Sequence, residues 1–293
     1  MRSAPPELET DVLAALPGLS ESGERERFLA ALRTAAAHRE EEQAIAMDPG
    51  EEDQLELPFA DSWDPRRAIV QWHRAGDVEE ATWLTFLTSY FAAADVGDPW
   101  RSVRTVYSGF GEHRIGWRAV YQDAAAALAP CTNRAKEYEG LSFGNHRKNE
   151  PLKADHRYGI EAVVRSYLTL VKRLGNGSQA QMFTRYNGDP GLKFHKLLVD
   201  VTGVLRFGRL GAFDFLTLLG TLGVQPLAPA HLYLEGSTWP LEGAKRLLGA
   251  PDRAKAPELD SRCSAVAREL GVSIAVMEEA LCTWHKGSPA RTA

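Results

Sequence analysis

The stretch DVEEATWLTFLTSYFAAA, residues 77–94, gives the clearest indication of secondary structure in the chain. It opens with Asp77, a residue type that often caps helix N-termini, and Glu79 and Glu80 suit the positive end of a helix dipole. Large apolar residues then recur at helical spacing as far as Phe91. The stretch therefore predicts a strongly apolar helix that begins after Asp77.

Similar patterns continue on both sides of this stretch. We expect further helices at about residues 23–46, 100–107, 117–128, 160–174, 192–205, 213–222, 238–248, 259–270 and 273–285. The period-two alternation that marks a strand is nearly absent, and residues 231–234 are its best candidate. The sequence therefore predicts an all-α fold.

Composition changes near residue 64. Residues 1–64 hold 16 acidic and 5 basic residues, a net charge of −11, and residues 48–64 are acidic, irregular and proline-containing. We expect an acidic N-terminal helix and linker at residues 1–64 and one helical domain at residues 65–293. The acidic segment is a candidate contact for a partner protein.

The basic residues concentrate in one part of the chain. Residues 101–210 hold 18 basic and 9 acidic residues, a net charge of +9, although the whole chain carries −5. Such asymmetry favours a polyanion such as DNA as a partner, and ordinary solvated helix faces are the alternative.

Other sequence features narrow the class of protein. No apolar run reaches the roughly 20 residues of a membrane span, and the N-terminus lacks a signal peptide. The three cysteines have no metal or disulfide spacing. We expect a cytoplasmic protein with no membrane contact, no cofactor and no metal, although histidines and carboxylates brought together by folding leave a metal site open.

Five separated segments carry a resemblance to the predicted alpha-glutamyl/putrescinyl thymine pyrophosphorylases, clade 3. They are Trp72-His73-Arg74-Ala75-Gly76-Asp77 with residues 79–84, Val106-Tyr107-Ser108-Gly109, residues 143–150, Arg206-Phe207-Gly208-Arg209 with Phe213-Asp214, and residues 236–246. The resemblance implies a helical fold like that of helix–hairpin–helix DNA glycosylases. It also implies thymine hypermodification, in which a hydroxymethyl-uracil in DNA is pyrophosphorylated and an amine displaces the pyrophosphate.

The densest polar cluster lies at residues 143–150. Gly144 is followed by Asn145, His146, Arg147 and Lys148, and Glu150 closes the segment. Arginine binds phosphate with two parallel hydrogen bonds and lysine acts as a point charge, so the segment is a candidate anion site. A surface loop is the alternative interpretation.

A second cluster follows at residues 206–214. Arg206 and Arg209 would share one face if this segment is helical. Asp214, between two phenylalanines, is either a helix cap or a catalytic carboxylate. Upstream, His73 and Arg74 precede a helix N-terminus, which favours anions, and Asp77 is expected to cap that helix.

We expect these segments to converge on one site of a transferase. Arg147, Lys148, Arg206, Arg209 and Arg74 would hold phosphates, and Asn145 would read a base edge. Asp214 or His146 would take the proton of the incoming amine or amino-acid co-substrate. His73, Asp77 and Glu150 would support them. One or two aromatic rings would stack on a flipped base, among the candidates Trp72, Tyr107, Phe110, Phe143, Tyr186 and Phe207.

Two other functions remain open at this point. A glycosylase-like hydrolase would use the same groove to remove a modified base, and a non-catalytic module would only bind modified DNA. The helical pair at residues 259–285 looks like a helix-turn-helix, but its second helix is acidic where DNA contact needs basic or amide groups. We interpret this pair as structural.

The charge distribution leads to a test of DNA binding. Because each neutralised phosphate releases counterions, binding through residues 101–210 should weaken steeply between about 50 and 200 mM salt. A titration of labelled DNA at several salt concentrations measures the slope. A salt-insensitive affinity would contradict the predicted basic surface.

Overall fold

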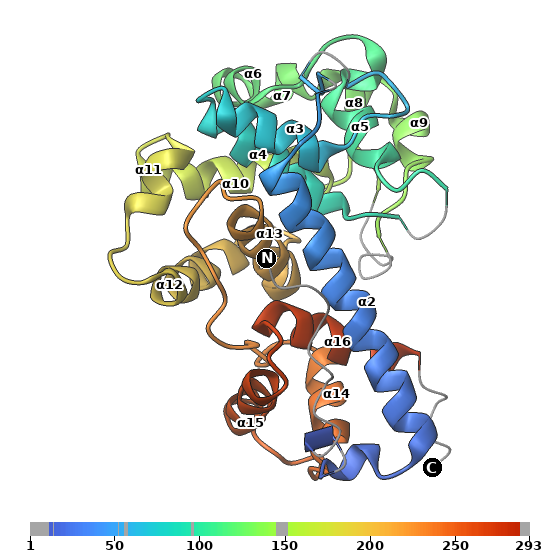
Figure 1. Ribbon diagram of the computed structural model, residues 1–293. Coiled ribbons are helices and arrows are strands. Elements are labelled where there is room, and N and C mark those ends of the chain that lie inside the picture. The colour runs from blue at the N-terminus through green and yellow to red at the C-terminus, as the bar shows by residue number, and fades with distance from the viewer. Residues whose placement is uncertain are drawn as a thin grey trace. The chain divides into compact units, whose positions relative to one another are not determined.

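The computed structural model describes residues 12–13, 15–51, 53–55, 58–94, 97–144 and 152–287. Over these residues it contains fifteen α-helices, two short 3-10 helices and no strand (Figure 1). The predicted all-α fold is confirmed. None of the described helices is long and apolar enough to cross a bilayer.

The chain divides into two compact units. Glu42–Ala228 form the central unit, and Met1–Glu41 together with Pro229–Ala293 form the terminal unit. This division differs from the predicted boundary at residue 64. The physical reason is that the first helical residues bury their apolar side chains among the C-terminal helices rather than forming a separate appendage.

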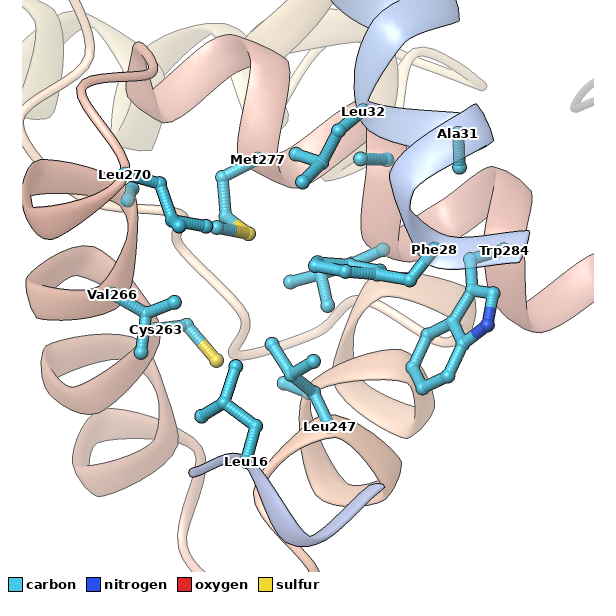
Figure 2. Packing of buried hydrophobic residues seen from close by; sticks show 14 of the residues in the cluster. Leu16, Phe28, Ala31, Leu32, Leu247, Cys263, Val266, Leu270, Met277 and Trp284 are labelled. Atoms are coloured by element: carbon cyan, nitrogen blue, oxygen red, sulfur yellow. The ribbon is translucent and has the colours of Figure 1, made fainter. Parts of the chain in front are cut away.

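The terminal unit is a small helical bundle with its own core. It contains η1 (Pro17–Leu19), most of α2 (Ser22–Met47), α14 (Trp239–Leu247), α15 (Ala256–Glu269) and α16 (Ile274–Lys286). Phe28 of α2 is fully buried and its ring lies 5.2 Å from that of Trp284, at 68° (Figure 2). Leu247, Cys263 and Met277 from the three later helices complete this core.

A buried carboxylate organises the segment before α14. Asp260 of α15 accepts hydrogen bonds from the backbone N–H groups of Leu232 (3.0 Å) and Leu234 (3.1 Å). Residues 231–234 were the best strand candidate, but Tyr233 has a φ of +52° and the segment is not a strand. The alternating buried leucines arise because one side-chain carboxylate takes the place of a partner strand.

The C-terminal helical pair packs inside the terminal unit. Ser273 caps α16 through the N–H of Val276, as its sequence suggests. Glu279 on α16 accepts hydrogen bonds from His38 (2.6 Å) and Arg39 (2.9 Å) of α2. Burial raises the pKa of Glu279, but these two partners outweigh it and lower the pKa overall. This face of α16 is covered by α2, which supports the structural interpretation of the pair.

The central unit is built around one buried helix. Its helices are α3 (Pro65–Arg74), α4 (Val78–Phe91), α5 (Arg101–Tyr107), η2 (Gly109–Gly111), α6 (Trp117–Gln122), α7 (Ala124–Ala127), α8 (Ala129–Asn133), α9 (Ala135–Glu139), α10 (Ile160–Gly175), α11 (Gln179–Thr184), α12 (Pro190–Thr202) and α13 (Gly208–Thr221). Every residue of α4 from Glu80 to Phe91 is buried. Asp77 caps α4 as predicted, because its carboxylate accepts the N–H of Glu80 at 2.9 Å. The single helix predicted at residues 117–128 is two helices, since Asp123 caps α7.

Glu79, in the first turn of α4, holds α11 in place. Its carboxylate accepts the hydroxyl of Ser178 (2.5 Å) and the N–H groups of Gln179 (2.9 Å) and Ala180 (3.1 Å). Gln179 is fully buried and accepts a hydrogen bond from the Tyr167 hydroxyl at 2.5 Å. The N-terminal amides of α11 are therefore used inside the protein.

The core of the terminal unit gives a stability prediction. Replacing Phe28 with alanine should lower the free energy of unfolding by about 3–5 kcal/mol, because a buried aromatic ring is removed and a cavity remains. Met47→Ala on the same helix is the matched control, since its side chain is 82 % exposed. Chemical denaturation of both variants measures the difference, and equal losses would contradict the packing described.

Candidate functional site

The hairpin between α12 and α13 carries two of the predicted arginines. Arg206 has a φ of +58° and lies before α13, which begins at Gly208 rather than near residue 213 as predicted. The two guanidiniums therefore do not share a helical face, because the backbone turns left-handed at Arg206 before the helix starts. The Leu205 N–H donates to the Ser166 hydroxyl at 3.0 Å, which ties the hairpin to α10.

A tyrosine ring brings two guanidiniums together beside this hairpin. The Arg206 guanidinium carbon lies 5.2 Å from the centre of the Tyr158 ring, and that of Arg157 lies 4.7 Å from it. Both arginines are exposed. The His156 ring lies 5.6 Å from that of Tyr158. We call Arg157, Tyr158 and Arg206 the Tyr158 cluster, and Arg157 and Tyr158 were not among the predicted site residues.

The neighbouring residues of α13 complete this region. Arg209 lies over the Phe213 ring at 4.8 Å. Asp214 is partly buried between the buried Phe213 and Phe215. Its helix-cap interpretation is wrong, because α13 begins six residues earlier and its N-terminal end has no side-chain cap. Asp214 is instead an acidic residue within an otherwise apolar helix.

The predicted residues around α3 and α4 lie at helix ends. Arg74 donates from Nη2 to the carbonyls of Ala46 (3.1 Å) and Met47 (2.7 Å), which places a cation at the C-terminal end of α2. His73 is in the last turn of α3, and its Nδ1 is buried without a hydrogen-bond partner in the described part of the chain.

The described residues end just before the segment of highest polar density. Asn145, His146, Arg147, Lys148 and Glu150 lie outside the described residues. The residues just before them are anchored to the end of α4. The Gly144 N–H donates to the Phe91 carbonyl at 2.8 Å, and the Phe143 ring stacks on that of Phe91 at 5.3 Å.

Sequence reasoning missed a buried carboxylate on α4. Glu80 is 5 % exposed and accepts hydrogen bonds from the Tyr107 hydroxyl at Oε1 (2.6 Å) and from the Trp117 N–H at Oε2 (2.7 Å). Burial raises its pKa above the ordinary value of 4.5, and the hydrogen bonds from Tyr107 and Trp117 and the charge of Arg114 oppose that rise. Burial also raises the pKa of Tyr107 well above its usual range, with Glu80 adding to the effect.

The residues around Glu80 leave space for its carboxylate. A Cβ at Gly116 would lie 2.9 Å from Glu80 Oε1, so a larger residue would displace the carboxylate. The Arg114 Nε lies 3.9 Å from the same oxygen, and the guanidinium carbon lies 4.6 Å from the centre of the Trp72 ring. Glu80 therefore joins α4 to α5 and to the turn at residues 114–117.

Half of the candidate aromatic residues belong to the core. Tyr107, Phe143 and Phe207 are buried. Arg114 lies over Trp72, Arg134 lies over Phe110 at 5.9 Å, and Lys196 lies over Tyr186 at 5.5 Å. The three less buried rings thus each lie beside a cation.

The family of the chain follows from comparison with known proteins. The family described as alpha-glutamyl/putrescinyl thymine pyrophosphorylase clade 3 matches residues 21–292. The chain belongs to this family. Its name indicates an enzyme that acts on thymine in DNA, with a pyrophosphorylase-like activity. No curated protein and no solved structure matches the chain.

The buried Glu80 gives a prediction about pH. A carboxyl whose pKa is raised by folding stabilises the folded state below its unfolded pKa, and this contribution is lost as the pH rises through the folded pKa. Glu80→Gln does not titrate. The variant should therefore gain stability relative to the wild type as the pH rises from about 4 to 7.

Chemical denaturation of both proteins across this range measures the difference in unfolding free energy. Glu258→Gln is the control, because it removes a carboxylate that is exposed rather than buried. A difference that moves in the opposite direction as the pH rises would contradict the burial of Glu80.

Proposed function

We propose that the protein modifies a pyrimidine base in DNA, replacing the pyrophosphate of a pyrophosphorylated hydroxymethyl-uracil with an amine. The amine nitrogen forms a bond to the 5-methylene carbon, and the bond from that carbon to oxygen breaks. Pyrophosphate leaves with the bonding electrons, and the proton of the amine passes to a base. Membership of a family named for thymine pyrophosphorylases supports this reaction.

The observation that carries the proposal is the Tyr158 cluster at the start of α13. Two exposed guanidiniums there can bind a phosphate through parallel N–H groups. The first turn of α13 has no side-chain cap, and such a helix end favours an anion. Helices α12 and α13 are joined by a short connection at residues 203–207, and a DNA contact through this connection would suit a glycosylase-like protein.

The charge that develops on the leaving pyrophosphate needs neutralisation. In the proposed site Arg206 and Arg209 bind phosphate groups, together with Arg147 and Lys148. Arg74 contributes a further cation, and its Nη2 donates to the carbonyls at the end of α2. His73, Asp77 and Glu150 support these groups.

The proton of the amine goes to Asp214 or to His146 in this proposal. Asp214 follows the arginine-bearing hairpin by two helical turns, and the phenylalanines beside it are buried. A partly buried carboxylate in such surroundings is suited to general-base catalysis. Asn145 reads the edge of the base.

Aromatic rings that lie beside cations suit the binding of a base that is flipped out of the DNA helix. Besides the Tyr158 cluster, Lys172 lies over the 39 % exposed Tyr121 at 5.7 Å, and Lys196 lies over Tyr186 at 5.5 Å. Bases stack on such rings while the cations attract the backbone. We propose that the flipped pyrimidine stacks at the Tyr158 cluster, on the exposed guanidinium plane of Arg157 or Arg206.

A hydrolase that removes the modified base is the second candidate. The position of Asp214 within a helix that follows a hairpin favours it, because the same carboxylate would orient a water molecule. The two reactions differ in their products. The transferase leaves an amine-substituted nucleoside in DNA, whereas the hydrolase leaves an abasic site and a free base.

The test combines a binding measurement with product analysis. Arg206→Ala should weaken binding to DNA by about tenfold and reduce the salt slope by about one, because one phosphate contact is lost. Arg165→Ala is the control, since Arg165 is exposed and pairs with Glu161 at 2.8 Å. Equal effects of the two variants would contradict the proposed contact.

Asp214→Asn separates chemistry from binding. It should keep DNA affinity and abolish the product, measured by mass spectrometry of nucleosides from host DNA with and without the gene. An unchanged nucleoside pattern with the wild-type gene would rule out the proposed transferase.

A further inference from the structure

Arg114 presents a guanidinium whose hydrogen-bond donors are unused among the described residues. Its side chain is 42 % exposed, stacked on Trp72 and 3.9 Å from Glu80. No group in the described part of the chain accepts a hydrogen bond from it at hydrogen-bonding distance. Guanidinium groups have five N–H donors in a planar fork, so Arg114 keeps that fork available to a ligand.

Three other arginines of the central unit use their donors within the protein. Arg66 donates to Asp64, and Arg104 is paired with Asp61 and Asp98 at 2.9 and 2.5 Å. Arg134 donates to Glu112 at 2.6 Å and to the Phe110 carbonyl at 3.2 Å. Arg114 differs from them because Trp72 and Glu80 hold its guanidinium without accepting hydrogen bonds from it.

The backbone that carries Arg114 is fixed on both sides. The Ile115 N–H donates to the Tyr107 carbonyl at 2.7 Å, and the Ile115 carbonyl accepts the Trp83 indole N–H at 2.8 Å. The Trp117 N–H is held by Glu80 at 2.7 Å. A side chain that starts from a fixed backbone and stacks on a ring loses little further entropy when it binds a ligand.

The two hydrogen bonds that Glu80 makes do not require a charged carboxylate. A glutamine could accept from the Trp117 N–H with its oxygen and donate to the Tyr107 hydroxyl with its amide nitrogen. The remaining difference between the two side chains is the negative charge, and the charge faces Arg114 at 3.9 Å. Since a buried carboxylate costs free energy, its charge is best explained by the guanidinium that it orients.

We propose that Arg114 is a phosphodiester-binding residue for DNA, preorganised by Glu80 and Trp72 as positioning residues. The terminal nitrogens of the fork donate two parallel hydrogen bonds to phosphate oxygens. This contact is separate from the Tyr158 cluster, and it rests on the proposed function in that the strand it binds is DNA. Arg114 was not among the predicted phosphate ligands.

The first test compares Arg114→Ala with Arg118→Ala. Arg118 is exposed on α6, four residues away, and has neither a ring nor a carboxylate beside it among the described residues. Fluorescence anisotropy with a labelled oligonucleotide, at about 50 and 200 mM salt, measures affinity and salt slope. Arg114→Ala should weaken binding about tenfold and lower the slope by about one, whereas Arg118→Ala should stay within about twofold.

The second test asks whether Glu80 acts through Arg114. Glu80→Gln should weaken DNA binding by less than Arg114→Ala and leave the helical signal in circular dichroism unchanged. In the Arg114→Ala background the same substitution should have no further effect on affinity, as a double-mutant cycle requires for coupled residues. An additive loss would show that Glu80 acts on the fold alone.

The possible failures are distinguishable. Absence of DNA binding by the wild-type protein overturns both the proposed function and this contact. If the wild type binds DNA but Arg114→Ala is indistinguishable from Arg118→Ala, only the Arg114 contact is overturned. The proposed role of the Tyr158 cluster then stands. Arg114→Lys adds a check of geometry, because it keeps the charge but loses the planar fork, and should recover only part of the affinity.

Discussion

Two adjacent carboxylates in the first turn of α4 connect distant parts of the central unit. Glu79 receives hydrogen bonds from residues 99 to 101 positions later, and Glu80 receives them from Tyr107 and Trp117. A carboxylate removed from water is stable only when its oxygens have partners, so each of these bonds is costly to break. The placement of α5, α11 and the turn that carries Arg114 therefore depends on one turn of helix.

Local signals predicted much of the fold. Asp77 and Ser273 mark helix starts, and Asn176, with a left-handed φ of +50°, ends α10 where the sequence predicts it. Helix α3 was not predicted, although Asp64 caps it and Pro65 occupies its first position. The start of α13 was misplaced because its cap position is Phe207, which has no capping side chain. The division into units depends on Phe28 packing with Trp284, which local periodicity cannot reveal.

The candidate site was less predictable for the same reason. Residue type makes Arg206 and Asp214 candidates, but only the folded chain brings Arg157 and Tyr158 to Arg206. Glu79 and Glu80 look alike in the sequence, as acidic residues that suit a helix dipole, and their long-range partners give them different tasks. No feature of the sequence distinguishes Glu80 from Glu79, so the burial of Glu80 follows only from the folded chain.

The discontinuity of the terminal unit affects the order in which the protein forms during synthesis. Its first 41 residues leave the ribosome early, but the helices that cover Phe28 begin after residue 229. At 5–20 residues per second, the apolar face of α2 waits roughly 10 to 40 s for its partners. The central unit is complete in that interval. We expect the nascent chain to need chaperone protection at its amino end, and a premature stop after residue 228 to leave that face uncovered.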